Sequence, residues 1–206
     1  SSGALINLVG ILLGAALNLW LLPKLFSTEE LGMYRWMERS AVLLSNILLF
    51  GVHRSFTKFH SDPSKDKKEF ESTVVGRSTL LMLAVGVLVF VFGPLLAPYF
   101  SFKPEDTYLL RYLSFFRVSG MAFLMAVSAA ATTKKIAIPV FIKNMGIRIA
   151  MIALALVLFL NSGIFGFSHW LIAYAWASLA LGAIALLYAW SRVKPTFYLR
   201  HLWAPM

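Results

Sequence analysis

Six long apolar runs constrain the fold of this chain of 206 residues more than any other feature. Each run has roughly the 20 residues that an α-helix needs to cross the hydrocarbon core of a membrane. Apolar and polar residues do not alternate within the runs, which argues against a membrane β-barrel. We therefore predict an all-α integral membrane protein, a bundle of six transmembrane helices near residues 4–22, 29–57, 75–97, 108–131, 136–160 and 168–191.

The composition agrees with a membrane location. Hydrophobic residues make up 59% of the chain, and the mean hydropathy of +0.76 exceeds that of soluble domains. The net charge of +10 does not indicate a nucleic-acid partner, because the basic residues flank the apolar runs instead of forming one soluble basic face. Without cysteine the chain has neither a disulfide framework nor a thiolate metal site, and we expect no metal ion or cofactor.

Lysine and arginine residues outside the runs are distributed unevenly between the two sides of the predicted bundle. Lys24 and Lys103 fall on one side, and eleven basic residues fall on the other: Arg54, Lys58, Lys65, Lys67, Lys68, Arg77, Lys134, Lys135, Arg192, Lys194 and Arg200. Because cytoplasmic loops carry the excess of Lys and Arg, we predict that both termini are cytoplasmic. Residues 1–193 then form the membrane bundle, and residues 194–206 an interfacial tail or the start of a linker.

The second run contains an unusual charged stretch, "GMYRWMERS" at residues 32–40. Ser27 followed three residues later by Glu30 is typical of a capping box, so the helix is predicted to begin near Thr28 and to include these charges. At about 100° per residue, one face of this helix carries a polar stripe whose members fall within roughly 40° of one direction. The stripe consists of Arg35, Arg39, Asn46 and His53, with Val42 as its apolar member.

Two further arginines are predicted deep within the membrane. Arg117 lies nine residues into the fourth run, and Arg148 lies twelve residues into the fifth, with Asn144 on the same face. An arginine at the centre of a membrane helix costs about 2.5–3.5 kcal/mol on insertion scales, so these side chains should face the interior of the bundle. Lys143, about 140° away from Arg148, is expected to reach the cytoplasmic interface instead.

An internal cavity with an excess of guanidinium groups favours an anionic ligand, and the planar fork of arginine matches phosphate in particular. Glu38, three residues from Arg35, is the acidic residue that can partly neutralise the stripe. The alternative is structural: intramembrane arginines can also bind main-chain carbonyls or lipid headgroups and so fix helix packing. Small residues, including Gly10 and Gly14 in the first run and Gly182 in the sixth, indicate close helix packing.

The run "GILLGAALNLWLLPKLFSTEELGMYRWMERSAVLLSNILLFGVHRSFTKF" resembles the N-terminal region of bacterial polysaccharide-biosynthesis flippases, the Wzx-like branch of the MOP exporter superfamily, which also contains the MATE transporters. The resemblance rests on Gly10 and Gly14, on "LPK" at the end of the first run, on "STEELGMYR", and on Gly51 before a basic end. Beyond residue 60 the likeness is one of hydropathy and number of runs.

The resemblance implies one lobe of a two-lobed, multi-pass transporter of the bacterial inner membrane, with a second, C-terminal lobe elsewhere in a longer protein. Such a protein flips undecaprenyl-diphosphate-linked oligosaccharide by alternating access, for surface polysaccharide or lipopolysaccharide biosynthesis, and its partners are this lipid-linked substrate and the membrane lipids. By position Arg35, Arg39, Arg117 and Arg148 are the residues that would engage the diphosphate.

Two other functions remain open. A cation-coupled multidrug exporter of the same superfamily would need an intramembrane carboxylate, and the first run has Asn18 where one would be sought. A membrane glycosyl- or acyltransferase acting on lipid-linked sugars would need acid–base residues, for which Glu29, Glu30, Glu105 and Asp106 are the candidates. We find no catalytic or metal-binding spacing in the chain and therefore expect a transporter rather than an enzyme.

Overall fold

The computed structural model describes residues 2–49, 67–95, 104–132, 137–160 and 166–193. Within these ranges every regular element is helical. The elements are α1 (Ser2–Ala16), the π-helix η1 (Leu17–Leu21), α2 (Leu22–Leu25), α3 (Thr28–Leu48), α5 (Lys67–Phe92), the 3₁₀-helix η3 (Pro104–Tyr112), α6 (Leu113–Thr132), α7 (Ala137–Phe141), the π-helix η4 (Ile142–Gly146), α8 (Ile147–Leu160) and α9 (Phe167–Arg192).

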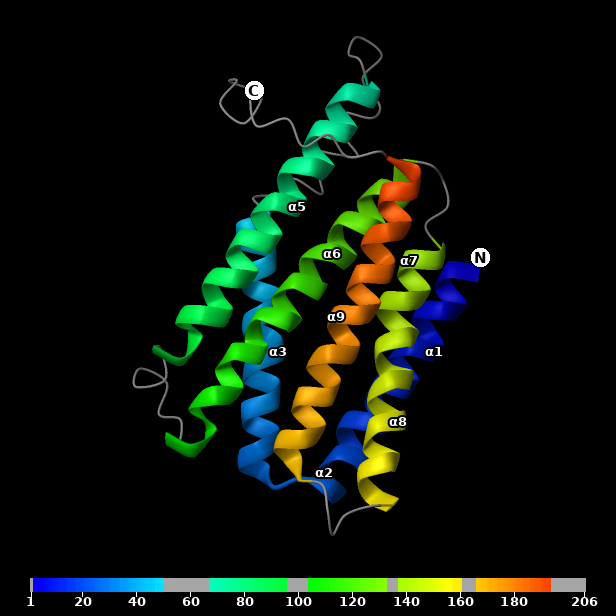
Figure 1. The fold of residues 1–206 in the computed structure, drawn as a ribbon. Helices are drawn as coiled ribbons and strands as arrows, with labels where there is room; N and C mark the ends of the chain where they lie inside the picture. Colours follow the sequence, from blue (N-terminus) through cyan, green and yellow to red (C-terminus); the bar gives the residue numbers. More distant parts are fainter. Residues whose placement is uncertain (1, 50–66, 96–103, 133–136, 161–165, 194–206) are drawn as a thin grey trace.

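Five helical segments are long and apolar enough to cross a membrane: Leu8–Leu25, Ser72–Leu95, Thr107–Ala131, Ile138–Leu160 and Phe167–Ser191. This confirms a multi-pass helical membrane protein. The sixth long helix, α3, has 21 residues but is less apolar than these five, because Arg35, Glu38 and Arg39 lie in its middle. It nevertheless stands within the bundle and packs against α6 (Figure 1).

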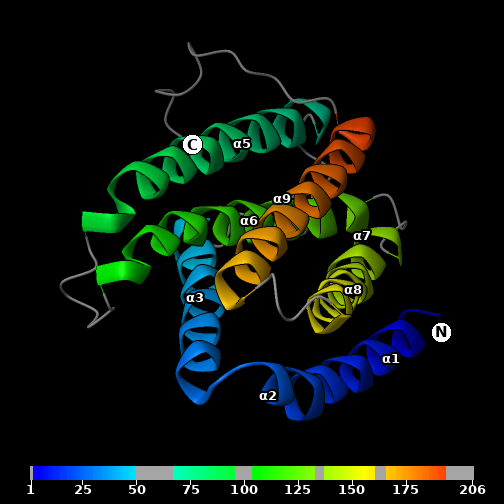
Figure 2. The ribbon, with the colours of Figure 1, turned by 60° about the horizontal axis from the view of Figure 1, so that its bottom comes forward.

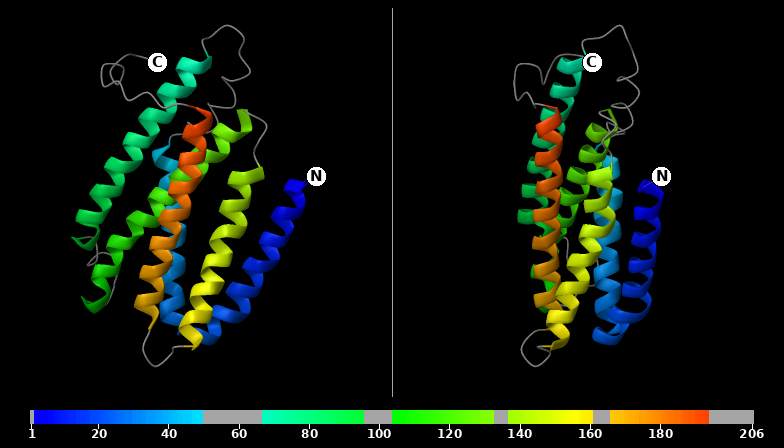
Figure 3. Two further views of the ribbon diagram at one scale, coloured as in Figure 1. Left: turned by 45° about the vertical axis from the view of Figure 1, so that its right-hand side comes forward. Right: turned by 90° about the vertical axis from the view of Figure 1, so that its right-hand side faces the viewer.

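The helices form an antiparallel bundle around α6 and α9, which make the most extensive helix pair (Figures 1 and 2). α5 and α3 pack on α6, and α8 packs on α9. α1 lies at the edge, against α7, η4 and α8. The N-terminal end of α1 and the C-terminal ends of α3, α6 and α9 lie at one end of the bundle, and α2 lies at the other (Figure 3). Each long segment thus runs opposite to the one before it, as successive membrane crossings require.

The start of one helix differs from the predicted run. α5 begins at Lys67, eight residues before the predicted residue 75, because the mostly polar residues 67–74 continue the helix beyond its apolar part. Residues 50–57 of the second predicted run lie outside the described residues, as does the predicted tail after residue 193. The other segments agree within a few residues, although the first and fifth contain π-helical turns that the sequence pattern does not indicate.

The predicted capping box at the start of α3 is confirmed. The main-chain N–H of Ser27 donates to Glu30 Oε2 at 2.8 Å, and the N–H of Glu30 donates to Ser27 Oγ at 3.3 Å. The helix therefore begins at Thr28, and the charged residues 35–39 lie inside it as expected. Close packing at Gly182 is also confirmed, because a methyl group there would lie 2.7 Å from Cα of Ser119 on α6.

An aromatic cluster fills the bundle at the end where α2 leads into α3. The rings of Phe26 and Trp170 have centroids 4.9 Å apart, and Tyr34 meets Trp170 edge-on at 5.4 Å. Trp170 also stacks on Tyr174 at 5.4 Å, and Phe167 meets Phe26 edge-on at 5.2 Å. All five side chains are buried. Offset and edge-on pairs of this kind add to the stability that burial gives, and they close this end of the bundle.

Candidate functional site

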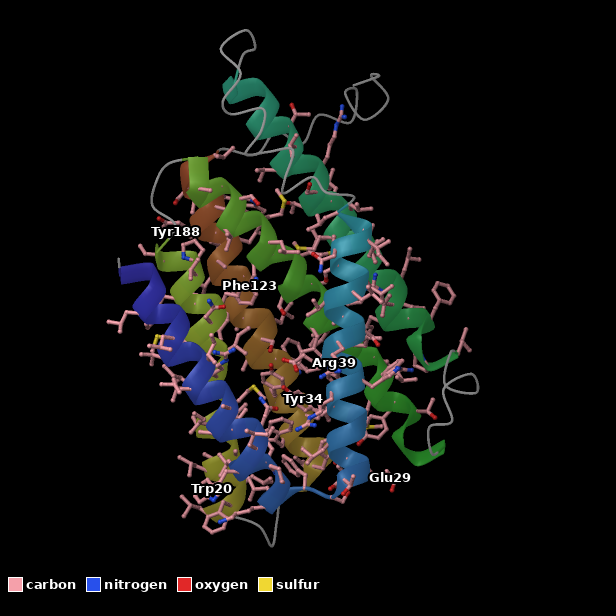
Figure 4. All side chains as sticks on the ribbon, turned by 180° about the vertical axis from the view of Figure 1, so that it is seen from behind. Trp20, Glu29, Tyr34, Arg39, Phe123 and Tyr188 are labelled. Atoms are coloured by element: carbon pink, nitrogen blue, oxygen red, sulfur yellow. The ribbon has the colours of Figure 1, made fainter. Side chains whose placement is uncertain are left out.

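A cavity of about 530 Å³ lies inside the bundle, beside the aromatic cluster. Five helical segments contribute to it: the first segment at η1, α3, α6, the η4–α8 segment and α9. Figure 4 views it from the side on which α1 and α3 stand in front of α9, with Tyr34 and Phe123 between them. The lining residues are Leu17, Asn18, Tyr34, Glu38, Ala41, Val42, Ser45, Asn46, Phe116, Ser119, Gly120, Phe123, Leu124, Lys143, Asn144, Ile147, Arg148, Met151, Tyr174 and Ser178.

The lining combines positive charge with neutral polar groups. Its cations are Lys143 and Arg148, both on the η4–α8 segment, and its acidic residue is Glu38 on α3. Amide and hydroxyl side chains and four aromatic rings make up much of the rest: Asn18, Asn46, Asn144, Ser45, Ser119, Ser178, Tyr34, Phe116, Phe123 and Tyr174. The lining therefore carries one more positive than negative charge and offers many hydrogen-bonding groups.

Three of the predicted site residues meet in this cavity, namely Asn46, Asn144 and Arg148. Arg148 lies ten residues after the start of the span Ile138–Leu160, or about 15 Å along it, and so close to mid-membrane. Its guanidinium packs against α1, where methyl groups at Gly10 and Gly14 would lie 2.7 Å from Nη1 and 3.0 Å from Cζ, respectively. Gly10 and Gly14 thus leave space on α1 for the side chain of Arg148.

Glu38 faces the same cavity from α3 and is partly buried. It lies within electrostatic range of Arg148 across the cavity, and of Arg39 and Arg35 on its own helix. Tyr34 and Tyr174 lie beside it, and the Tyr34 hydroxyl contacts Met151 Sδ at 3.8 Å. The carboxylate thus compensates part of the arginine charge.

Arg35 and Arg39 share one face of α3, as the stripe predicts, but both are exposed and neither lines the cavity. Arg35 Nη2 donates a hydrogen bond to the main-chain carbonyl of Asn18 at 3.2 Å. Arg39 lies about halfway along α3 (Figure 4). Their roles as substrate contacts stay predictions. His53 lies outside the described residues.

Arg117 is placed differently from the other predicted residues. It is 5% exposed and does not line the cavity. Its main-chain carbonyl accepts a hydrogen bond from Ser45 Oγ at 3.2 Å, and its Nε is buried without a hydrogen-bond partner. The side chain therefore lies within the helix packing rather than in the cavity.

No protein-family model, curated protein or solved structure matches this chain. Its function therefore has to be inferred from the residues of the cavity. Within the described ranges, no group of three or more His, Asp or Glu residues is placed to hold a metal ion.

Lys143 is the lining residue whose position differs from the one expected from sequence. In a regular α-helix it would point about 140° away from Arg148. It lies instead in η4, where Ile147 N–H bonds to Ile142 O, five residues back, and the wider turn reduces the rotation between the two residues. Both cations therefore line one cavity. Asn18 also lies in a π-helical turn and lines the cavity.

The lining groups are suited to binding an anion. Guanidinium and ammonium groups form strong charge-assisted hydrogen bonds with a phosphate or carboxylate. The amides, hydroxyls and aromatic rings around them are the groups that bind polar, hydroxyl-rich molecules.

Proposed function

We propose that this chain is one lobe of a flippase that moves undecaprenyl-diphosphate-linked oligosaccharide across the bacterial inner membrane, for surface polysaccharide biosynthesis. The observation that carries the proposal is the pair of cations, Lys143 and Arg148, lining a cavity inside a bundle of membrane helices. Placing charged side chains within the membrane costs free energy, and binding of an anionic ligand there would offset that cost.

The diphosphate would bind at Arg148 and Lys143, because both are donors that bind phosphate oxygens. The first sugars would lie against the remaining lining, where Asn18, Asn46 and Ser178 offer hydrogen bonds and Phe116 and Phe123 offer flat apolar faces. A cavity of about 530 Å³ in this lobe holds a few sugar rings at most. The rest of the oligosaccharide would then lie against the second lobe that the resemblance to flippases implies.

Transport requires access from each side of the membrane in turn. The aromatic cluster of Phe26, Tyr34, Phe167, Trp170 and Tyr174 closes the bundle at one end. Asn46 and Lys143, both exposed, lie toward the opposite end. That end carries the basic excess and is assigned to the cytoplasm, so the lobe would be open toward the cytoplasmic side.

The test is surface polysaccharide production by the natural gene product that contains these residues. Arg148→Gln should abolish polysaccharide at the cell surface while the protein remains in the membrane in normal amounts. Arg111→Gln is the matched control, because Arg111 is exposed and lies outside the cavity. Normal polysaccharide with Arg148→Gln would refute the proposal.

A cation-coupled multidrug exporter is the second candidate, and the position of Glu38 favours it. A carboxylate that lines a membrane cavity is the group that such exporters use to bind a proton or Na⁺. Here it lies on α3 instead of on the first helix, where the sequence has Asn18. Drug efflux from cells producing the natural protein, lost with Glu38→Gln and kept with Arg148→Gln, would support the exporter over the flippase.

A further inference from the structure

Two glycines of α1 have a charged side chain as their closest neighbour. A methyl group at Gly14 would lie 3.0 Å from both Cζ and Nε of Arg148 and 3.3 Å from its Nη2. At Gly10 the closest atom is Nη1 of the same arginine, at 2.7 Å, followed by the carbonyl of Asn144 at 3.2 Å. The guanidinium therefore lies over a notch that the two glycines leave on the surface of α1.

Other tightly packed glycines of the described helices contact different groups. A methyl group at Gly182 would meet the backbone of Ser119 at 2.7 Å, and one at Gly86 would meet Cγ2 of Val118 at 2.5 Å. Those glycines allow two helices to approach each other, which is the usual role of small residues in membrane bundles. The space at Gly10 and Gly14 is occupied largely by one long cationic side chain.

The position of this notch determines where the charge sits. Arg148 lines the cavity and lies within electrostatic range of Glu38 on the opposite helix. Arginine has several rotatable bonds, and holding its guanidinium in one place reduces the conformational freedom that would otherwise be lost when a ligand binds. A side chain at residue 14 would push the planar group away from α1 and change its orientation.

We infer that Gly10 and Gly14 are positioning residues, which hold the Arg148 guanidinium in the orientation that binds the phosphate group of the substrate. This inference rests on the proposed function, because it assigns the glycines to the same anion site. It differs from ordinary helix packing in one respect. Gly14→Ala should weaken anion binding through the displacement of Arg148 and not through a separation of α1 from the bundle.

Binding of farnesyl diphosphate, a short soluble prenyl diphosphate, to the natural full-length protein in lipid nanodiscs tests the inference. Arg148→Gln should weaken binding by roughly 10- to 100-fold, as expected for loss of charged hydrogen bonds. Gly14→Ala should weaken it by about 10-fold, while the midpoint of thermal unfolding stays within a few degrees of the wild type. The matched control is Gly32→Ala on α3, where a methyl group meets no atom within 4 Å, and binding should change less than twofold.

A conservative change at Arg148 separates positioning from packing. Lysine has no planar group to place over residue 14, so in an Arg148→Lys protein the further change Gly14→Ala should weaken binding little more. The double variant should therefore bind about as weakly as Arg148→Lys alone. Packing damage alone would instead multiply the two losses. Should Gly14→Ala fail to give a monodisperse protein, Gly10→Ala provides the second variant, with the same expected non-additivity.

The outcomes distinguish the two proposals. Loss of binding with Arg148→Gln but unchanged binding with Gly14→Ala overturns the positioning role and leaves the proposed function in place. Losses that multiply in Gly14→Ala/Arg148→Lys also overturn the positioning role. Unchanged binding with Arg148→Gln overturns the anion site itself.

Discussion

The Arg35 guanidinium donates a hydrogen bond to the main-chain carbonyl of Asn18, 3.2 Å away on the first membrane segment. That carbonyl has lost its donor within its own segment. In an α-helix the donor would be the N–H of Leu22, which bonds to Leu17 O in the π-helical turn. One residue further along, Pro23 has no N–H to donate. Arg35 therefore completes the backbone hydrogen bonding where the π-helix and the proline interrupt it.

Replacing Arg35 with alanine should destabilise the protein by about 1–2 kcal/mol, since hydrogen bonds from charged donors contribute roughly 1.5–3 kcal/mol and this one is partly open to its surroundings. In a Pro23→Ala background residue 23 gains an N–H that can reach the Asn18 carbonyl, so the loss should be smaller. The free energies of unfolding of the wild type, Arg35→Ala, Pro23→Ala and the double variant in detergent micelles measure the coupling between residues 23 and 35. Arg39→Ala, one turn along α3, is the control and should cost the same in both backgrounds. Equal losses for Arg35→Ala in the two backgrounds would contradict the explanation.

Regular helical features of this chain could be predicted from sequence because local chemistry decides them. Ser27 and Glu30 are three residues apart, which is the spacing of a capping box, and this spacing correctly predicted that α3 begins at Thr28. The common face of Arg35, Arg39 and Asn46 on α3 also followed from a constant rotation per residue, although the sequence did not indicate that all three would be exposed.

The cavity was harder to predict because it depends on departures from regular geometry. Lys143 reaches the cavity through the π-helical turn of η4, and no periodic pattern in the sequence signals that turn. Arg117 was expected in the cavity on depth alone, but depth does not specify the direction of a side chain, and it lies outside the lining. The notch at Gly10 and Gly14 looks in sequence like any other small-residue packing motif, because the contacting group comes from a helix more than 130 residues away in the chain.

The capping box at the start of α3 should contribute measurably to stability. Ser27→Ala removes the acceptor for the N–H of Glu30 and should lower the free energy of unfolding by about 1 kcal/mol. Thr28→Ala is the control, because Thr28 is exposed at the first helical position, and its effect should be within about 0.5 kcal/mol. Chemical denaturation in micelles gives both values. A cost for Thr28→Ala equal to that for Ser27→Ala would show that the cap is not the source.

Gly182 on α9 is tightly packed and Gly32 on α3 is not, so alanine substitutions at the two positions should have opposite effects on stability. Gly182→Ala places a methyl group 2.7 Å from Cα of Ser119, so the helices must separate, and overpacking of this kind costs about 1–3 kcal/mol. Gly32→Ala has open space around it and should stabilise α3 by roughly 0.5–1 kcal/mol through helix propensity. Thermal unfolding of the two variants beside the wild type checks the signs. Stabilisation by Gly182→Ala would mean that α6 and α9 are not in contact at this point.

These 206 residues contain no cysteine, so the sidedness of the cavity can be measured by single-cysteine labelling. Asn46→Cys and Lys143→Cys are exposed positions of the cavity lining, whereas Lys24→Cys is exposed at the opposite end of the bundle (Figure 1). The basic excess assigns the end of the bundle that carries residues 46 and 143 to the cytoplasm. A membrane-impermeant maleimide should therefore label residues 46 and 143 in inside-out vesicles and residue 24 in intact spheroplasts. Residue 17, which is 2% exposed although it lines the cavity wall, should react much more slowly as Leu17→Cys in either preparation. Labelling of residues 24 and 143 from the same side would contradict the parallel crossing of the first and fifth segments, which places the end of the first and the start of the fifth at opposite ends of the bundle. Fast labelling of residue 143 only in spheroplasts would reverse the orientation assigned to the cavity.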